Sequence, residues 1–306
     1  MTRMLPIAAG VLLLAALLPA TGAVAQTASE GLSPTLANIK KNGTVRLGYR
    51  ESSPPFSFLD HSNRPIGYSL ELCEAIVEEI ATEVDNADLK VEYVKVTSDD
   101  RIQAVLDNKI DLECGSTTAN AERSKQVAFS PLMFVAGTKL MVPKASPISA
   151  VTDMKGKTVV VTKGTTNEQA MHNVDKKFSL GLNIITSPDH EQSYQMLAEG
   201  KADAFATDDI LLYGLIARHK SQDKFRVTGE YLSYDPYGIM FRKGEPQLSA
   251  VVERTFRKLG SNRDLIPLYN KWFVARLPTG EKLGVSISPQ LEEAFKVLDD
   301  TQGTSN

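Results

Sequence analysis

Hydrophobic and polar positions follow two alternating patterns along this chain. Short apolar runs alternate with longer segments in which apolar residues recur every three to four positions. The first pattern is typical of buried strands, and the second is typical of amphipathic helices. Regular alternation of the two kinds of element indicates an α/β architecture.

The predicted elements extend over most of the chain. In the first half, the sequence predicts strands at 45–49, 89–96 and 110–114, helices at 69–84 and 101–108, and an extended run at 134–142 after a turn at 129–131. In the second half, it predicts strands at 158–162, 183–186, 202–207 and 237–241, and helices at 166–177, 191–199, 210–219 and 247–259.

The two halves of the chain contain similar sequence segments. QAVLDNKIDLECGS in the first half and YQMLAEGKADAFATDD in the second share one plan, an apolar helix, a short connector and a strand that ends in polar residues. A chance match over so short a stretch is the alternative. We predict two Rossmann-like α/β lobes joined by two crossing strands. The expected division is a first lobe from 26–137 and 235–306, the latter including a C-terminal tail, and a second lobe from 138–234.

Residues 1–25 have the pattern of a cleaved signal peptide. Arg3 supplies a positive charge, an apolar run from 7 to 18 follows, and Ala23-Val24-Ala25 matches an A-x-A cleavage signature. A membrane helix needs roughly 20 apolar residues, so this run is too short for the alternative, an uncleaved anchor. The chain has no cysteine near the cleavage position, which argues against a lipoprotein. We therefore expect cleavage after Ala25 and export of a soluble protein.

The composition excludes some classes of partner. The chain has 42% hydrophobic and 23% charged residues and a net charge of −3. Removing residues 1–25 deletes one arginine and no acidic residue, which leaves 33 basic against 37 acidic residues and a net charge of −4. Nucleic-acid-binding surfaces are usually strongly basic, so we expect no nucleic acid as partner. Two cysteines and four scattered histidines do not form a metal-ligand pattern, and we expect neither a metal nor a cofactor.

The two cysteines raise a separate question. Cys73 lies on the predicted helix 69–84, and Cys114 lies at the end of the predicted strand 110–114. In an oxidising compartment two such thiols can pair. The sequence leaves open whether they form a disulfide.

The segment ECGSTTANAERSKQVAFSPLMF, from Glu113 to Phe134, carries the strongest chemical signal. A hydroxyl-rich turn follows a predicted strand and precedes a predicted helix that contains Arg123 in its first turns. Strand ends that lead into helix starts bind small ligands in open α/β sheets, and free N–H groups at a helix start favour an anion. A guanidinium can bind a carboxylate through two parallel hydrogen bonds. We therefore predict a carboxylate-binding segment that contains Ser116, Thr117, Thr118 and Arg123.

Two more arginines lie at strand–helix junctions of the first lobe. Arg50 ends the strand 45–49, beside a stretch at 54–58 with two prolines and two aromatic residues, which we interpret as a stiff, partly apolar wall of a ligand site. Arg101 follows Ser98, a suitable helix N-cap. Taken singly, both arginines could be surface residues and Ser98 only a cap. Three arginines at three such junctions favour a shared site.

The second lobe supplies polar residues at similar places. Gly164 to Thr166 join a strand to a helix in another turn suited to an anion. His190 begins a helix, and Asp208 and Asp209 follow an apolar strand. A lone histidine is more often structural, and a helix N-cap explains one of the aspartates. An aspartate among several arginines would also suit a ligand ammonium, so the charges favour a compact zwitterion with surplus negative charge.

Together these motifs make the chain resemble one known family of proteins. From about residue 36 to 278 the chain resembles the periplasmic glutamate/aspartate-binding proteins of ABC importers, in the type II solute-binding family, through RESS, TS–DR, ECGSTT, ER, TKGTT, DH and DD. The resemblance implies the type II periplasmic binding protein fold, with lobes that close on the ligand. It also implies ligand contacts, with Arg50, Ser98, Arg101 and His190 at the side-chain carboxylate, Thr118, Arg123 and Thr166 at the α-carboxylate, and Ser116 and Asp208 at the ammonium.

The leading hypothesis is a periplasmic, monomeric, non-enzymatic protein that captures L-glutamate or L-aspartate and delivers it to an inner-membrane ABC permease. Amide ligands would leave the cations poorly compensated, whereas one methylene is worth too little to separate glutamate from aspartate by sequence. One alternative is a dehydratase or lyase on the same scaffold, with His190 and Asp209 as its only candidates for acid/base chemistry. The other is a sensing module that signals to a membrane receptor.

Overall fold

The computed structural model describes residues 31–299. The predicted signal peptide and residues 300–306 lie outside the described residues. Among the residues described, no helix combines the length and the apolar character needed to cross a membrane.

The first large sheet contains strands from both ends of the chain. Its order is β5 (Lys90–Lys95), β1 (Thr44–Tyr49), β6 (Leu112–Glu113), β15 (Met240–Arg242) and β7 (Val127–Phe129). The strand β1 pairs in parallel with β5 and β6, whereas β15 is antiparallel to both of its neighbours. A strand from residues 240–242 thus lies between two strands from residues 112–129.

The second large sheet repeats this arrangement with a continuous part of the chain. Its order is β11 (Asn183–Ser187), β10 (Thr158–Thr162), β12 (Ala204–Asp208), β9 (Thr138–Pro143) and β13 (Phe225–Thr228). The strand β10 is parallel to β11 and β12, and β9 is antiparallel to β12 and β13. Both sheets therefore have the same order of parallel and antiparallel pairs, and the strands predicted to correspond, β6 and β12, hold the same central position.

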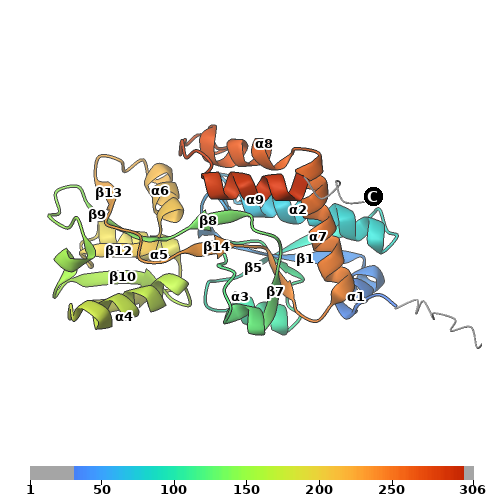
Figure 1. The fold of residues 1–306 in the computed structure, drawn as a ribbon, viewed down its shortest axis with the longest axis horizontal. Coiled ribbons are helices and arrows are strands. Elements are labelled where there is room, and N and C mark those ends of the chain that lie inside the picture. The colour runs from blue at the N-terminus through green and yellow to red at the C-terminus, as the bar shows by residue number, and fades with distance from the viewer. Residues whose placement is uncertain (1–30, 300–306) are drawn as a thin grey trace, which may run out of the picture. The chain divides into compact units, whose positions relative to one another are not determined.

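A short two-stranded sheet connects the two lobes. It pairs β8 (Phe134–Ala136) with β14 (Asp235–Tyr237) in antiparallel register, so that Asp235 lies opposite Ala136 and Tyr237 lies opposite Phe134. The chain passes from β8 into the second sheet at β9 and returns through β14 to β15 (Figure 1). The predicted pair of crossing strands is confirmed.

Helices cover both large sheets. They are α1 (Pro34–Asn42), α2 (Tyr68–Glu83), α3 (Arg101–Leu106), α4 (Thr166–Phe178), α5 (His190–Ala198), α6 (Asp209–Arg218), α7 (Pro246–Ser261), α8 (Leu265–Tyr269) and α9 (Pro289–Asp299). Shorter turns are η1 (Arg123–Lys125), η2 (Val151–Met154) and the π-helical η3 (Asn270–Val274). A three-stranded sheet contains β2 (Ser52–Ser53), β3 (Ser57–Leu59) and β4 (Pro65–Ile66).

Alternating side chains of the second sheet divide its core into two layers. Val159 and Val161 pack with Met171 of α4, whereas Val160 packs with Leu197 of α5 and with residues of α6. Successive residues of a strand point to opposite faces, so the short apolar run of β10 serves both layers (Figure 1). This explains why β10 is apolar at consecutive positions.

The first sheet is covered in the same way. Phe241 of β15 belongs to the large core formed with α2 and α7, whereas its neighbour Met240 packs with Val105 of α3. The aromatic residues Phe56 and Phe58 are also buried in the large core. The prediction that they form a ligand-site wall is therefore wrong, because their rings pack against Tyr68, Phe134, Tyr237, Trp272 and Phe273.

The structure corrects three predicted elements. The helix expected around Arg123 is only the three-residue 3₁₀ turn η1, because the chain enters β7 at Val127. The single strand expected at 237–241 is two strands, since Tyr237 pairs with the crossing strand β8 and Met240 pairs within the first sheet. The strand expected at 110–114 contains only β6, and α1, α8, α9 and several short strands were not predicted.

A disulfide joins Cys73 of α2 to Cys114, which directly follows β6. The two Cα atoms are 6.2 Å apart, within the range that a disulfide spans. The question that the sequence left open is thereby answered in this structure. The link fixes the helix against the strand end that precedes Ser116.

Candidate ligand-binding site

The predicted site residues lie at the ends of strands and the beginnings of helices in both lobes. Arg50 follows β1, Ser98 precedes α3 and Arg101 is the first residue of α3. In the second lobe, Asp208 ends β12. The remaining predicted residues are Ser116 and Thr118 after β6, Arg123 at the start of η1, Thr166 at the start of α4 and His190 at the start of α5. All of them except the half-buried Thr166 are buried.

Most of these residues line one small cavity, whereas Arg50 and Arg123 do not line it and Arg123 lines a neighbouring groove. A cavity of about 10 Å³ is lined by residues of both lobes. The lining residues are Ser98, Arg101, Ser116, Thr118, Thr165, Thr166, Asn167, His190, Asp208 and Leu211. A cavity of this size is about large enough for one water. The lobes are therefore closed tightly around the predicted residues, and an amino acid needs them to move apart.

The three arginines are close enough to influence one another electrostatically. Burial and the neighbouring charge of Arg101 lower the pKa of Arg50 to about 10. Burial and Arg101 also lower the pKa of Arg123 to about 9. Burial lowers the pKa of Arg101 as well, while the nearby carboxylate of Glu113 acts in the opposite direction. All three remain cationic at neutral pH, so the site concentrates positive charge.

Several polar atoms of this cluster have no partner in the structure. Both terminal nitrogens of Arg50, the Nε of Arg101 and the Oγ of Ser98 are buried without a hydrogen bond. Buried polar groups in folded proteins are normally hydrogen-bonded, and an exception needs an explanation. Here the unpaired donors carry charge or lie beside it, which fits a place prepared for an anionic group.

Ser98 does not cap the helix that follows it. The N-cap of α3 is Asp100, and reciprocal hydrogen bonds form the turn, from the Thr97 amide to Asp100 Oδ1 at 2.7 Å and from the Asp100 amide to Thr97 Oγ1 at 3.2 Å. The interpretation of Ser98 as an N-cap is therefore wrong. Ser98 instead lines the cavity together with Arg101, and its hydroxyl has no hydrogen-bond partner.

Arg123 joins the two lobes. Its Nη1 donates to the carbonyl of Thr118 at 2.9 Å, and its Nη2 donates to the carbonyl of Gly164 in the second lobe at 3.4 Å. Thr118 Oγ1 and Thr166 Oγ1 are 3.2 Å apart across the same boundary. The predicted α-carboxylate contacts are thus brought together, although η1 is too short to supply the helix end that the sequence predicted.

His190 is neutral at physiological pH. Burial, Arg50 and Arg101 together hold its pKa well below the ordinary value. Its Nδ1 is 2.7 Å from Thr162 Oγ1, and Thr162 is bonded in turn to Ser193. When Thr162 donates to Nδ1, the imidazole proton is on Nε2 and is available to an acceptor in the cavity.

Asp208 precedes α6 but its side chain makes no capping hydrogen bond to that helix. It accepts a hydrogen bond from Asn167 Nδ2 at 2.8 Å and another from the hydroxyl of Tyr237. Burial and the nearby Asp235 raise the pKa of Asp208 to about 7. The capping explanation fails for this residue, and its carboxyl is held at the cavity wall.

Other polar residues complete the site and were not predicted as ligand contacts. Asp235 of β14 accepts from Thr118 Oγ1 at 3.1 Å and from Thr166 Oγ1 at 2.8 Å. Glu113 is fully buried, and its Oε2 accepts from Thr117 Oγ1 at 2.6 Å while its Oε1 has no partner. Glu113 is the first residue of the ECGSTT motif and Asn167 directly follows TKGTT, a signal that could have found them. No local signal singles out Asp235.

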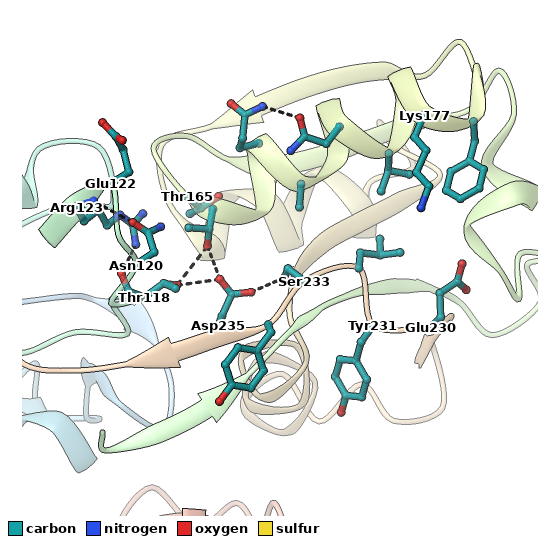
Figure 2. Close-up of a pocket in the computed structure, with 18 residues that line it drawn as sticks. Thr118, Asn120, Glu122, Arg123, Thr165, Lys177, Glu230, Tyr231, Ser233 and Asp235 are labelled. Carbon is teal, nitrogen blue, oxygen red and sulfur yellow. Dashed lines mark hydrogen bonds between the residues drawn. The ribbon is translucent and has the colours of Figure 1, made fainter. Parts of the chain in front are cut away.

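A second, larger space opens beside the cavity. This groove of about 670 Å³ shares Thr118, Thr165 and Thr166 with the cavity and extends along α4. Figure 2 shows Arg123 and Asn120 at one end of the groove and Lys177 and Glu230 toward the other. Arg101, His190 and Asp208 do not line it. The groove is therefore an outer space next to the closed site, separated from it by the threonines.

The described residues contain no cluster of three or more histidine, cysteine, aspartate or glutamate side chains that could hold a metal ion. Instead the site contains arginines, hydroxyls and one histidine on two lobes joined by two strands. An arrangement of this kind is typical of proteins that close around a small anionic solute.

The chain belongs to the bacterial extracellular solute-binding proteins, family 3, whose family pattern matches residues 45–275. It is 41% identical to the L-glutamate/L-aspartate-binding protein of Pseudomonas aeruginosa over 273 residues, which cover 88% of this chain and 90% of that protein. It is 36% identical to the glutamate/aspartate import solute-binding protein of Escherichia coli, over 94% of this chain and 96% of the relative. The predicted family is confirmed, and the protein is a solute-binding protein.

Solved structures agree with this fold. An ancestral arginine-binding protein bound to arginine aligns with a TM-score of 0.68 and 31% identity, over 76% of this chain and 98% of that one. An ancestral amino-acid-binding protein described as a precursor of cyclohexadienyl dehydratase aligns with a TM-score of 0.66 and 31% identity, over 78% and 99% of the two chains. The predicted fold class is thereby confirmed.

Proposed function

We propose that this protein captures L-glutamate and L-aspartate between its lobes and delivers them to the membrane permease of an ABC importer. The proposed second lobe spans 138–234, and the proposed first lobe comprises 26–137 together with 235–306. Ligand contacts from both lobes would make binding and closure one event.

One observation carries the choice of an acidic ligand. Arg50, Arg101 and Ser98 hold buried donors that no protein group satisfies. A carboxylate in contact with them would supply both the missing hydrogen bonds and a compensating charge. A neutral amide would leave a guanidinium uncompensated in a closed space. We therefore assign these residues, with His190, to the ligand's side-chain carboxylate.

The neutral state of His190 fits this assignment. A buried imidazole between two guanidinium groups has a strongly lowered pKa, so it adds a donor and no further positive charge. The positive charge of the three arginines already exceeds the negative charge of one carboxylate, so a charged imidazole would add to the excess. Glu113, fully buried among them, offsets part of that excess.

The other end of the ligand would meet the remaining residues. Thr118, Arg123 and Thr166 would bind the α-carboxylate, and Ser116 and Asp208 would accept from the ammonium. Asp208 Oδ1 and Oδ2 already accept from Asn167 and Tyr237, and each carboxylate oxygen retains capacity for another donor. The names of the relatives from Pseudomonas aeruginosa and Escherichia coli, which bind or import glutamate and aspartate, support the same ligand class.

A thermal-shift screen over the common amino acids tests the proposal. A ligand that binds only the folded state raises the melting temperature by mass action. We expect clear shifts with L-glutamate and L-aspartate and none with glutamine, asparagine or arginine at equal concentration. A largest shift with a neutral or basic amino acid would refute the assignment of the arginine cluster.

We propose that the protein is not an enzyme. The relation to a dehydratase precursor makes this worth testing directly. Burial and two neighbouring arginines lower the pKa of His190, which weakens it as a general base, and Asp209 accepts a hydrogen bond from Tyr231 at 2.7 Å. We expect glutamate and aspartate to be recovered unchanged after prolonged incubation with the protein, as judged by NMR.

We further propose a monomeric periplasmic protein whose mature form begins at Gln26. The A-x-A signature at 23–25 supports this cleavage position. Mass spectrometry of the exported protein should give the mass of residues 26–306. Recovery of the intact chain, including residues 1–25, would contradict cleavage.

A further inference from the structure

Asp235 forms hydrogen bonds with two residues, Thr118 and Thr166, that are proposed above to bind the ligand. The Oγ1 atoms of Thr118 and Thr166 both donate to its Oδ1, at 3.1 and 2.8 Å. These are two of the groups assigned above to the α-carboxylate. Figure 2 shows the Asp235 carboxyl between Thr118 and Ser233. A carboxylate of the protein itself therefore occupies these donors in the closed structure.

The two threonine hydroxyls cannot serve two carboxylates at once. A hydroxyl has one proton to donate, and both hydroxyls lie within hydrogen-bond distance of the same oxygen of Asp235. A second carboxylate placed beside them would also meet the negative charge of Asp235, which is 2% exposed and so poorly screened by water. Ligand binding and the present contacts of Asp235 exclude each other.

The position of Asp235 connects these contacts to the movement of the lobes. It is the first residue of β14, one of the two crossing strands, and pairs with Ala136 of the other. Thr118 belongs to the first lobe and Thr166 begins α4 of the second. One side chain of the crossing strands thus contacts a residue of each lobe.

Asp235 also has an alternative partner when the threonines leave it. Its Oδ2 accepts from the hydroxyl of Ser233, which in turn is bonded to the amide of Thr138 at 2.9 Å and to its Oγ1 at 2.7 Å. This second set of hydrogen bonds does not involve the predicted ligand contacts. The carboxylate can therefore release Thr118 and Thr166 without losing every hydrogen bond.

We propose that Asp235 is an affinity-determining residue that competes with the ligand's α-carboxylate for Thr118 and Thr166 and holds the lobes together without ligand. The inference rests on the proposed function in requiring an α-amino acid as ligand and in placing its α-carboxylate at Thr118 and Thr166. Because every α-amino acid has this carboxylate, the inference holds for any such ligand and does not depend on glutamate. It sets the affinity of the site below the value that its other contacts would give.

The test compares wild type with Asp235→Asn, which keeps the shape and removes the charge. A matched control is Glu230→Gln, which removes a carboxylate charge from an exposed position on the same groove. Calorimetric titration with L-glutamate should give about tenfold tighter binding for Asp235→Asn, because the hydrogen bonds to the competitor lose their charge assistance and the repulsion of the ligand's carboxylate is removed. The glutamate affinity of Glu230→Gln should stay within about twofold of the wild-type value, because water and salt screen the charge of an exposed carboxylate. Unchanged or weaker binding by a folded Asp235→Asn protein would overturn the proposal.

A second variant and a second readout cover the case of a misfolded protein. Asp235→Ser has a side chain too short to reach both threonines, and it should show the same direction of change if circular dichroism confirms the fold. Without ligand, small-angle scattering should give a larger radius of gyration for both variants than for wild type. Equal radii would contradict the role in holding the lobes together.

The wild-type titration separates this inference from the proposed function. If wild type binds another α-amino acid instead of glutamate, the acidic-ligand proposal fails, and the Asp235 comparison is repeated with that amino acid. If wild type binds glutamate but Asp235→Asn binds it no better, only the inference on Asp235 fails.

Discussion

Individual residues of the site combine buried charge with unsatisfied hydrogen-bonding capacity. Arg50 and Arg101 are 1% and 2% exposed, and each retains at least one unpaired nitrogen. Buried charged groups without a hydrogen-bond partner reduce the stability of the folded protein, and a bound ligand that supplies the partner restores it. The folded protein therefore carries a local cost that an anionic ligand would remove.

Replacement of Arg101 by alanine should show how much binding depends on this charge. Removing one partner of a buried ion pair costs about 3–5 kcal/mol, so we expect Arg101→Ala to lower glutamate affinity by about a hundredfold or more. The exposed Arg276→Ala is the matched control. Calorimetry that finds wild-type affinity in a folded Arg101→Ala protein would contradict the assignment.

Asp208 should make ligand binding depend on pH. Burial, Asp235 and Asp209 raise the pKa of Asp208 to about 7. Hydrogen bonds from Tyr237 and Asn167 act in the opposite direction and lower it. The ionised form is the one that attracts an ammonium. As the pH falls from 8 to 6, a growing fraction of Asp208 is protonated and affinity should fall, by at most about tenfold per pH unit.

Titrations at several pH values test this dependence. His190 does not titrate in the same range, because its pKa lies well below the ordinary value. The variant Asp208→Asn should bind more weakly and lose the dependence between pH 8 and 6. A constant affinity for wild type over that range would exclude ionised Asp208 as the ammonium partner.

At the scale of helices and strands, sequence patterns predicted the regular elements well. The elements β10, α4, β11, α5 and β12 lie within a few residues of their predicted ranges, because each has a strong periodic pattern and polar ends. The same patterns indicated the strand ends to which the proposed site is assigned. Arg50, Arg101 and Arg123 lie around one buried region, as their shared position at strand–helix junctions suggested.

Elements defined by distant partners could not be predicted in this way. The residues from 237 to 241 have one apolar pattern, yet β14 pairs with β8 and β15 pairs with β6 and β7. Asp235 meets Thr118 across 117 positions of sequence. No local pattern encodes such contacts. The prediction of a ligand-site wall at Phe56 and Phe58 was wrong for a related reason, because aromatic residues occur in hydrophobic cores as well as in the walls of ligand sites.

The disulfide between α2 and the end of β6 should contribute to stability. It closes a loop with a sequence separation of 41 residues, for which the chain-entropy relation gives about 4 kcal/mol at 25 °C. The double variant Cys73→Ser/Cys114→Ser should unfold at lower urea concentration by a corresponding amount. Addition of a reductant to wild type should produce the same shift. A variant as stable as oxidised wild type would exclude a stabilising role.

For the whole molecule, closure depends on contacts between the lobes that lie outside the ligand site. Arg218 of α6 donates to the carbonyl of Leu59 at 3.2 Å. Lys163 forms an ion pair with Asp99 at 2.8 Å. Gly214 of α6 lies so close to Pro54 that a Cβ atom there would be 2.3 Å from the Pro54 carbonyl oxygen. The closed arrangement therefore requires glycine at this position.

The substitution Gly214→Ala should separate closure from folding. Alanine favours a helix over glycine by about 1 kcal/mol, so α6 should remain folded and the variant should keep the far-ultraviolet circular dichroism of wild type. The new methyl group would keep α6 away from Pro54, and glutamate affinity should fall about tenfold or more, the equivalent of about 1–3 kcal/mol for overpacking. Unchanged affinity measured by calorimetry would show that closure does not need this contact.

The insertion of β15 between β6 and β7 bears on the order in which the polypeptide can acquire its structure during synthesis. The sheet of residues 138–228 has all of its strands as soon as that stretch has emerged. The other sheet must keep an internal position open for residues 240–242, between β6 and β7, and until these arrive two strand edges can pair with a wrong partner. A nascent chain that stops short of residue 240 would therefore carry one finished half and one half prone to aggregation.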